Sequence, residues 1–585
     1  MTATLVDIRR GAYYDSAFLM LLQRTLSDLP GVQDAGVIMG TPTNKELLAA
    51  IDLLPAEAQT ARPDDLLIVV RAEDETAARD ALARVDDLLT RKQTAHSAEY
   101  RPQSLETAAA MLPDAAWVLV SVAGRYAAVV ARNALRLGKH VFLFSDNVPV
   151  EEEIQLKAMA AAKGLLVMGP DCGTALIRGI GLGFANKVRL GPIGVVAAAG
   201  TGLQQVTARI HQLGGGVSYG IGAGGRDLTE KVGAVTFRQG IDLLARDPET
   251  SVIVLVSKPP APKVAEEMLQ VARSAPKPVV VNFIGRPAST WQMDNLYFAT
   301  GLDDAARLAM ELTSPPAPPL PGEGSIPPPS LAGKGVGGSG FAPTQRYLRG
   351  LFSGGTLAYE AQYLLQGYLP KVWANAPLNK ADRIPNSLVS QEHTIIDLGE
   401  DEFTVGRLHP MMDNELRIRR LMQEAADPEV AVIMLDVVIG YGSHPNPASE
   451  LAPAIAKAKA TAAAAGRYLE VVAVVTGTDE DPQNLVSQIE QLRAAGAWVD
   501  ASNETVVRYA GRLLRALNSQ YPIPNTQQPV DLATLQRPLS AINVGLESFA
   551  ENLIAQGVPA IQVDWRPPAG GNEKLMMILE RMKGN

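Results

Sequence analysis

Cysteine is almost absent from the sequence, because Cys172 is the only one among 585 residues. A single thiol cannot form an internal disulfide, and no group of cysteines and histidines has the spacing of a zinc or iron–sulfur site. We therefore expect no metal centre and a reducing, cytoplasmic location.

The sequence also lacks a basic surplus, a long apolar run and an apolar leader. Lys and Arg number 53 against 62 Asp and Glu, a net charge of −9, which disfavours binding to nucleic-acid phosphates. The longest apolar runs, 193–199 and 431–435, are far shorter than the roughly 20 residues that cross a bilayer. Asp7, Arg9 and Arg10 interrupt the N-terminal stretch, where a secretory leader would be apolar. We expect neither nucleic acid nor a membrane as a partner.

Several catalytic signatures are missing as well. No GxSxG, Walker A or HExxH pattern occurs, which argues against serine hydrolase, P-loop NTPase and zincin chemistry. Histidine occurs six times, and none lies between His211 and His393. A phosphorylatable imidazole therefore cannot come from that stretch.

The apolar content, 47% against 20% charged residues, is that of a globular protein with large cores, and its spacing predicts an α/β fold. Residues 1–92 alternate apolar runs at 5–8, 36–39 and 66–70 with helical patterns at 16–26 and 76–89, which predicts a small ferredoxin-like α+β domain. From residue 115 strands and helices alternate regularly. This order predicts a parallel, Rossmann-like sheet over 93–190.

Two similar units follow, over 191–313 and 341–525. ARDPETSVIVL at 245–255 resembles AADPEVAVIML at 425–435 position by position, which indicates a duplicated α/β unit. A Pro- and Gly-rich linker at 314–340 separates the copies, and we expect its deletion to be tolerated. A βαβ-like tail occupies 526–585.

Two glycine-rich turns connect a predicted strand to a predicted helix. They contain Gly200, Thr201 and Gly202 in the first copy, and Gly354, Gly355 and Thr356 in the second. Free N–H groups at such a helix start, approached closely across glycine, form an anion site. The alternative is that glycine only permits the turn and threonine only caps the helix. Because two such turns that face one another could hold a phosphate between them, we interpret the pair as phosphate-binding.

Other loops at strand ends are candidate walls of a pocket. They are 220–233, with Arg226 as a candidate for binding a substrate carboxylate, and 438–447, with Gly440, Tyr441 and Gly442. Arg226 could equally form a solvated ion pair with Asp227.

Four polar side chains in loops complete the candidate set. His409 and His444 lie in loops where a general acid or base could act. Asp171 and Cys172 lie in the turn MGPDCGTALI, where the thiol is a possible nucleophile but more commonly a small buried group. The loop carboxylates Glu400, Asp401 and Glu402 could bind Mg²⁺, although we favour exposure to water.

Several segments resemble known families. MGPDCGTALI and GVVAAAGTGLQQ are similar to the turn and the helix start of the succinyl-CoA synthetase α subunit. GTPTNKELL, LFSDNVPVEEEI, HTIIDLGEDEFTVGRLHPMMD and VDWRPPAGGNEKL together resemble the FdrA family across nearly the full length. The resemblance implies a CoA-binding-type domain over 93–190, two flavodoxin-like, ligase-type domains, and Asn186 of GFANKVRL as part of the substrate pocket.

The FdrA resemblance also implies a role as a subunit of oxamate carbamoyltransferase in allantoin breakdown, where oxalurate and phosphate give oxamate and carbamoyl phosphate. Partner subunits are then encoded separately, and the chain forms a homo- or hetero-oligomer. Phosphate is the co-substrate, and no other cofactor is required.

Two other functions stay open. The first is an acyl-CoA ligase subunit of the succinyl-CoA synthetase type, which would use CoA and ATP. That enzyme needs a histidine that is missing from the matching stretch here, 285–305, and an ATP-grasp domain for which no segment is long enough. The second is a non-catalytic scaffold or regulator whose N-terminal domain senses a small ligand.

Overall fold

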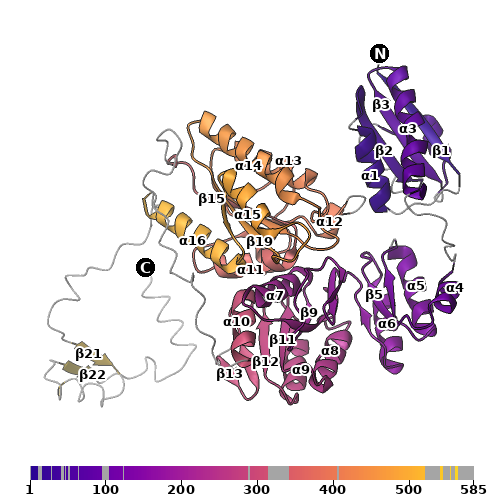
Figure 1. Cartoon of the computed structure of the whole chain (residues 1–585). Coiled ribbons are helices and arrows are strands. Elements are labelled where there is room, and N and C mark those ends of the chain that lie inside the picture. Colours follow the sequence, from indigo (N-terminus) through magenta and orange to yellow (C-terminus); the bar gives the residue numbers. More distant parts are fainter. Residues whose placement is uncertain are drawn as a thin grey trace, which may run out of the picture. The chain divides into compact units, whose positions relative to one another are not determined.

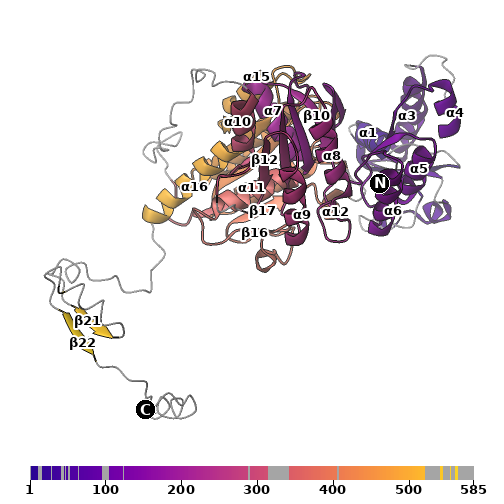
Figure 2. The same cartoon turned by 90° about the horizontal axis from the view of Figure 1, so that it is seen from below.

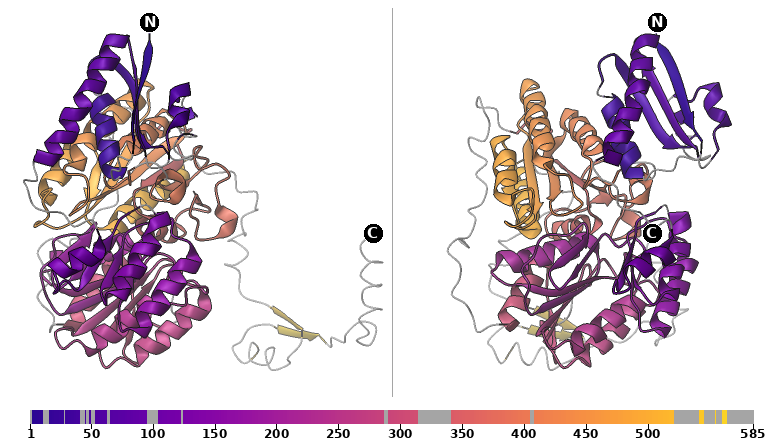
Figure 3. Two further views of the ribbon diagram at one scale, coloured as in Figure 1. Left: turned by 90° about the vertical axis from the view of Figure 1, so that its right-hand side faces the viewer. Right: turned by 45° about the vertical axis from the view of Figure 1, so that its right-hand side comes forward.

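The N-terminal domain is a small antiparallel sheet whose long helices pack on one face, while a short 3-10 helix packs on the other (Figures 1 and 3). The computed structural model describes residues 2–520 except 11–15, 28, 41–44, 46–47, 50–52, 63–64, 95–103, 123, 287–289, 314–340 and 405–407, together with 541–544, 554 and 560–563. Strands β1 (Ala3–Arg9), β2 (Val32–Met39) and β3 (Leu66–Ala72) pair in the order β1-β3-β2. Helices α1 (Ser16–Ser27) and α3 (Glu75–Thr94) connect and follow them, and η1 spans Ala56–Thr60. A small ferredoxin-like α+β domain was predicted here; the structure shows a small antiparallel α+β domain, and among the described residues its sheet has three strands.

A three-stranded parallel sheet comes next. Strands β4 (Trp117–Val120), β5 (His140–Leu143) and β6 (Val167–Met168) pair in that order. Helices α4 (Leu105–Met111), α5 (Gly124–Arg136) and α6 (Val150–Ala162) accompany them. Helices α5 and α6 pack together on one face of this sheet, whereas Phe142 and Met168 belong to a separate core that contains Ile221 and Phe237.

The first α/β copy has an eight-stranded sheet in the order β13-β14-β12-β11-β9-β10-β7-β8. Its strands are β7 (Thr174–Ile177), β8 (Ile180–Gly183), β9 (Ile193–Ala198), β10 (Val217–Gly222), β11 (Val252–Ser257), β12 (Val279–Phe283), β13 (Gln292–Met293) and β14 (Leu296–Phe298). Its helices are α7 (Gly200–Gln212), α8 (Val235–Arg246), α9 (Pro262–Arg273) and α10 (Leu302–Thr313). The β7–β8 hairpin precedes the predicted boundary at residue 190, yet it pairs with β10, so the sheet crosses that boundary.

The second copy has a six-stranded parallel sheet in the order β16-β17-β15-β18-β19-β20. Its strands are β15 (Tyr347–Phe352), β16 (Trp373–Ala374), β17 (Thr394–Asp397), β18 (Val430–Val438), β19 (Glu470–Thr476) and β20 (Trp498–Asp500). Its helices are α11 (Gly355–Leu365), η2 (Lys380–Asp382), α12 (Asp401–Thr404), α13 (Glu415–Ala426), α14 (Pro447–Ala464), α15 (Leu485–Ala494) and α16 (Asn503–Gln520).

The strand orders of the two copies match once equivalent strands are aligned. The order β10-β9-β11-β12-β14 corresponds to β17-β15-β18-β19-β20, and the equivalent strands β9 and β15 each lead directly into a glycine-rich turn. The repeated segments also coincide, because Asp247 and Asp427 end α8 and α13 with nearly the same backbone angles and precede β11 and β18. These equivalences support the predicted duplication.

Helices of both copies share one hydrophobic core, which brings the two glycine-rich turns together. Leu203 and Val206 of α7 pack in the same cluster as Leu357 and Ala361 of α11, and residues of α10 and α16 complete the cluster. Figures 1 and 2 show α7 and α11 where the two copies meet.

The C-terminal residues 522–585 form a separate unit, in which β21 (Ala541–Val544) and β22 (Ala560–Val563) are parallel. A parallel pair is what a βαβ unit contains. The predicted linker, 314–340, lies outside the described residues. Among the residues described, none of the helices has the length and apolarity needed to span a membrane.

Candidate functional site

Both glycine-rich turns lie at the carboxyl ends of parallel strands, and neither helix start is capped by a side chain. The residue before α7 is Ala199 and the residue before α11 is Gly354, and no side-chain hydrogen bond caps either helix. Thr201 and Thr356 lie inside the first turns instead. The capping interpretation of the threonines is therefore wrong, and the first-turn N–H groups stay available to an anion.

The two turns face one another, as predicted, but they also touch. A Cβ atom on Gly354 would collide with the Thr201 side chain, and one on Gly202 would lie 2.7 Å from Cγ2 of Thr356. The threonine methyl groups therefore fill the space between the turns. An anion has to approach from the outer side of a helix start, where Gly200 is exposed and Gly355 is partly exposed.

Two buried polar side chains beside these turns lack partners. The hydroxyl of Thr356, which is 1% exposed, and both amide atoms of Gln204, also 1% exposed, have no hydrogen-bond partner among the described residues. Such groups are costly unless something satisfies them.

Lys258 provides the positive charge next to the second turn. It follows β11, and its Nζ lies 2.7 Å from where a Cβ on Gly355 would be. Within the described part of the chain, no carboxylate lies within the 4.0 Å of an ion pair with this ammonium group. Burial alone would lower the pKa of Lys258, but Asp397, Glu400 and Asp171 outweigh it, so that its pKa is raised and the group is charged at neutral pH.

Asp397, at the end of β17, also lies next to the second turn. Its Oδ2 lies 2.5 Å from the Cβ position of Gly355, and its Oδ1 accepts a 2.9 Å hydrogen bond from the Gly399 amide. Burial raises the pKa of Asp397 to about 7, against the opposing charge of Lys258. Asp171 reaches solvent, but protein surrounds it closely enough to raise its pKa to about 6. Both carboxyl groups can therefore exchange a proton near neutral pH.

His409 places a ring nitrogen near the Asp397 carboxyl group, beside Gly399. Its Nε2 lies 3.1 Å from where a Cβ on Gly399 would be, the same separation as Oδ1 of Asp397. Its Nδ1 accepts a hydrogen bond from the Met411 amide at 3.2 Å, which assigns the proton of the neutral ring to Nε2. Burial, followed by Arg417, lowers the pKa of His409 to about 4. The ring is therefore a neutral hydrogen-bond donor at pH 7.

The other predicted polar residues are engaged elsewhere. Arg226 pairs with Glu153 at 3.0 Å and donates to the Val148 carbonyl. His444 faces Glu450 at 3.4 Å. Cys172 is 2% exposed, and its Sγ contacts the carbonyls of Thr174 and Gly222. Burial raises the pKa of this thiol to about 12, so the structure places a protonated core residue here.

Asn186 and the loop of Gly440, Tyr441 and Gly442 join the two copies. Asn186 donates to the Ile439 carbonyl at 2.7 Å and to Oδ2 of Asp481 at 2.8 Å. Tyr441 forms a backbone bridge with Ala185. Gly440 and Gly442 adopt φ values of 122° and 77°, which favour glycine.

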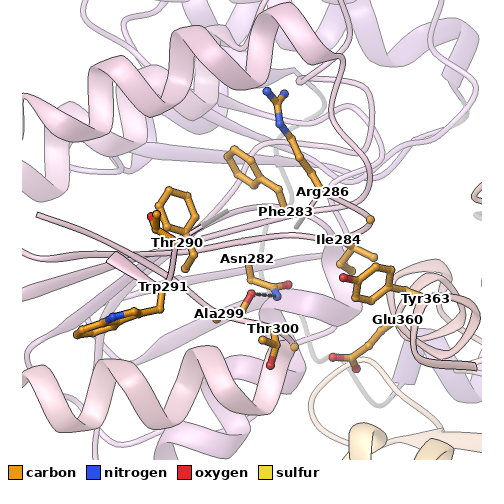
Figure 4. Close-up of a pocket in the computed structure, with 13 residues that line it drawn as sticks. Asn282, Phe283, Ile284, Arg286, Thr290, Trp291, Ala299, Thr300, Glu360 and Tyr363 are labelled. Atoms are coloured by element: carbon orange, nitrogen blue, oxygen red, sulfur yellow. Dashed lines mark hydrogen bonds between the residues drawn. The ribbon is translucent and has the colours of Figure 1, made fainter. Parts of the chain in front are cut away.

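The stretch that lacks histidine, 285–305, contains the β13–β14 hairpin and lines a cavity of about 230 Å³ (Figure 4). Asn295 anchors the hairpin by donating to the carbonyls of Ala272, Ala275 and Lys277. Glu360 of α11 lines the opposite side of the cavity and accepts the Leu302 amide at 2.7 Å. This stretch thus forms part of a sheet and a cavity wall, and offers no imidazole to the glycine-rich turns.

Comparison with known proteins identifies two matching families. A model described as CoA-ligase matches residues 351–513, and one described as AllF, heavy metal-associated domain, matches residues 1–105. The uncharacterized protein YahF of Escherichia coli K12 is 42% identical over 498 residues, which are 85% of this chain and 96% of that protein. The chain belongs to the YahF family.

Beyond the YahF family, the similarity is to CoA-ligase subunits. The malate–CoA ligase subunit alpha of Methylorubrum extorquens is 26% identical over 27% of this chain and 55% of that subunit. The sulfoacetate-CoA ligase subunit SauD of Bilophila wadsworthia is 29% identical over 26% of this chain and 52% of that subunit. The match thus spans about half the length of each subunit, and the predicted resemblance to CoA ligases is confirmed at that level.

The N-terminal domain does not fit the heavy-metal ion that its family description mentions. Soft metals select thiolate ligands, but the single cysteine, Cys172, lies outside residues 1–105. The described residues also contain no group of His, Cys, Asp or Glu that could hold a metal ion.

Lys258 and Asp397 were missed by sequence reasoning. Lys258 directly follows β11 and Asp397 ends β17, in the stretches SVIVLVSK and TIID. A charged residue at the carboxyl end of a parallel strand was the available signal.

Proposed function

We propose that this member of the YahF family is an FdrA-like, cytoplasmic subunit of a carbamoyl-transfer enzyme, and that it catalyses phosphorolysis of oxalurate to oxamate and carbamoyl phosphate. The observation that carries the proposal is the Lys258 ammonium group, which has no ion-pair partner among the residues described, next to the uncapped helix start at Gly355. A fixed cation and free backbone N–H groups at one point suit a phosphate. The family that matches residues 1–105 is described as AllF, which supports a role in allantoin breakdown.

The surrounding groups suit the chemistry. A phosphate oxygen attacks the carbamoyl carbon, the bond from that carbon to the oxamate nitrogen breaks, and this nitrogen receives the proton that hydrogen phosphate gives up. Asp397, with its pKa of about 7, carries that proton between the two sites. The Nε2–H group of His409 donates to the oxygen that becomes negative on the carbamoyl carbon. The reaction needs neither ATP nor a covalent enzyme intermediate.

The second candidate is a subunit of an acyl-CoA ligase, and the CoA-ligase match over 351–513 favours it. In that case the enzyme uses CoA and ATP, and a separately encoded subunit supplies the ATP-grasp domain and the missing histidine. In either case we propose that partner subunits complete the enzyme.

The test is an assay of the purified chain, alone and with the products of neighbouring genes. Carbamoyl transfer from carbamoyl phosphate to oxamate is measured beside ATP-dependent CoA thioester formation, and CoA binding is measured by isothermal titration. We expect transfer that depends on the chain and no CoA binding. Thioester formation without carbamoyl transfer would overturn the proposal in favour of the ligase.

A further inference from the structure

A cavity of about 440 Å³ opens at the carboxyl ends of β16 and β17. It is lined by Tyr359, Asn375, Ala376, Pro377, Lys380, Arg383, Glu400, Asp401 and Glu402. Lys380 and Arg383 are exposed. Neither forms an ion pair with a carboxylate of the described residues.

This cavity borders the site that contains Lys258. Tyr359 is one helical turn beyond Gly355 on α11, and Nζ of Lys258 lies 5.6 Å from the centre of its ring. Asn375 connects the cavity lining to the Lys258 site. Its side-chain amide exchanges two 2.9 Å hydrogen bonds with the backbone of Asp397 and donates a third to the Glu402 carboxylate. A molecule in the cavity can therefore extend one end toward Lys258.

The charges of the lining restrict what fits. Two cations attract an anionic group, whereas the three carboxylates Glu400, Asp401 and Glu402 repel a second one. The same carboxylates accept hydrogen bonds from N–H groups. A short acid with a carboxylate at one end and N–H groups at the other satisfies both sides.

We propose that this cavity binds a small amido- or ureido-carboxylate, with its carboxylate on Arg383 and Lys380 and its N–H groups toward Glu400 and Asp401. The inference rests on the proposed function, whose substrate oxalurate and product oxamate belong to this class. It assigns the carboxylate to Arg383 and Lys380 in place of Arg226, which Glu153 already holds.

The test measures binding by isothermal titration and needs no turnover. Oxamate, which has a carboxylate and an amide, is compared with oxalate, which has no N–H group, and with oxamide, which has no carboxylate. The full chain is used, alone and with its partner subunits. We expect oxamate to bind at least about tenfold more tightly than either analogue.

The variants Arg383→Gln and Lys380→Gln should each weaken oxamate binding about tenfold, and Glu400→Gln should reduce the preference for oxamate over oxalate. Arg246→Gln, at an exposed arginine on α8, is the matched control and should bind oxamate normally. Thermal melting shows that each variant is folded. If Arg383→Gln is unfolded, Lys380→Gln alone decides.

Two results overturn the inference: no oxamate binding by the unmodified chain, or oxamate binding that is unchanged in the Lys380 and Arg383 variants. Neither result depends on whether carbamoyl phosphate is formed. Conversely, oxamate binding that needs Arg383, with no carbamoyl transfer in the assay above, would leave the inference standing and contradict the proposed reaction.

Discussion

At the scale of single residues, the charges around Lys258 decide what the site can bind. This ammonium group lies among carboxylates that raise its pKa, so it keeps its charge, and in the described part of the chain no carboxylate forms an ion pair with it. This combination suits an anionic ligand better than it suits a structural salt bridge, in which the partner would already be in contact.

Lys258→Met should weaken phosphate binding at least about tenfold, because a charge-assisted contact is lost. It should also change the pH dependence. Lys258 holds the pKa of Asp397 down against burial, and the proposed reaction needs the Asp397 carboxylate. The rate should therefore rise with pH through about 7 in the unmodified chain, and this midpoint should move to higher pH in the variant.

Phosphate titration and a pH profile of carbamoyl transfer measure the two effects. Lys263→Met, at an exposed lysine five residues away, is the control and should change neither. An unshifted midpoint in Lys258→Met would show that Asp397 is not the group that titrates.

Glu360 makes the stability of the fold depend on pH. Burial, reinforced by Asp303, raises the pKa of this carboxyl group from its ordinary 4.5 to about 8. Between these pH values the unfolded chain loses the proton and the folded chain keeps it, so stability falls as pH rises. Glu360→Gln removes that loss of stability. A reversed Asn503 amide keeps the hydrogen bond between the two side chains, while the 3.3 Å bond from Asn503 to the Leu357 carbonyl is lost.

We expect Glu360→Gln to be more stable than the unmodified chain by about 4 kcal/mol at pH 8, with little difference at pH 4.5. Urea unfolding at the two pH values measures this. Glu311→Gln, at an exposed carboxyl group on α10, is the control. Equal gains at both pH values would mean that Glu360 does not titrate in this range.

At the scale of secondary-structure elements, the starts of α7 and α11 hold each other in place. The Thr201 side chain occupies the space where a Cβ atom on Gly354 would lie, and the Thr356 side chain occupies the corresponding space next to Gly202. Gly354 has φ of −140°, which any residue adopts, so that only the close contact requires glycine there.

Gly354→Ala should therefore destabilise the chain by about 2 kcal/mol through overpacking. Adding Thr201→Gly should recover part of this loss, and a double-mutant cycle from urea unfolding measures the coupling. Gly367→Ala is the control, because its nearest neighbour would be the Leu364 carbonyl at 3.5 Å. Strictly additive effects of the two changes would contradict the contact.

The elements were more predictable from sequence than the site. Apolar runs marked β9, β11, β12 and β18, because strands covered on both faces must be apolar throughout. The β7–β8 hairpin was harder to assign, since its pairing with β10 is a property of the tertiary fold. Lys258 and Asp397 are far apart in sequence and meet only because two sheets present their carboxyl ends to one place, which no local pattern records.

At the scale of the whole molecule, Asp481 connects the two copies. Its Oδ2 accepts from Asn186 and from the Thr478 amide, both at 2.8 Å, and its Oδ1 accepts from the Lys187 amide at 2.7 Å. Thr478 returns a bond to the Lys187 carbonyl. One carboxylate thus satisfies donors from both copies.

Asp481→Ala should cost about 3 kcal/mol, because three donors lose their acceptor. Urea unfolding measures the loss, and limited proteolysis should show cleavage between the copies at lower urea than in the unmodified chain. Asp413→Ala, at a carboxylate that accepts a hydrogen bond from the nearby Glu415 amide, is the control. Stability equal to that of this control would show that the connection contributes little.

The contact between α7 and α11 has a further consequence, because both helices belong to one polypeptide. If the two halves of such a site were carried by different chains, mass action would separate them on dilution. Here the covalent link fixes their effective concentration. The pairing of the two helix starts is therefore independent of how much protein the cell makes, and only the binding of the proposed partner subunits would respond to abundance.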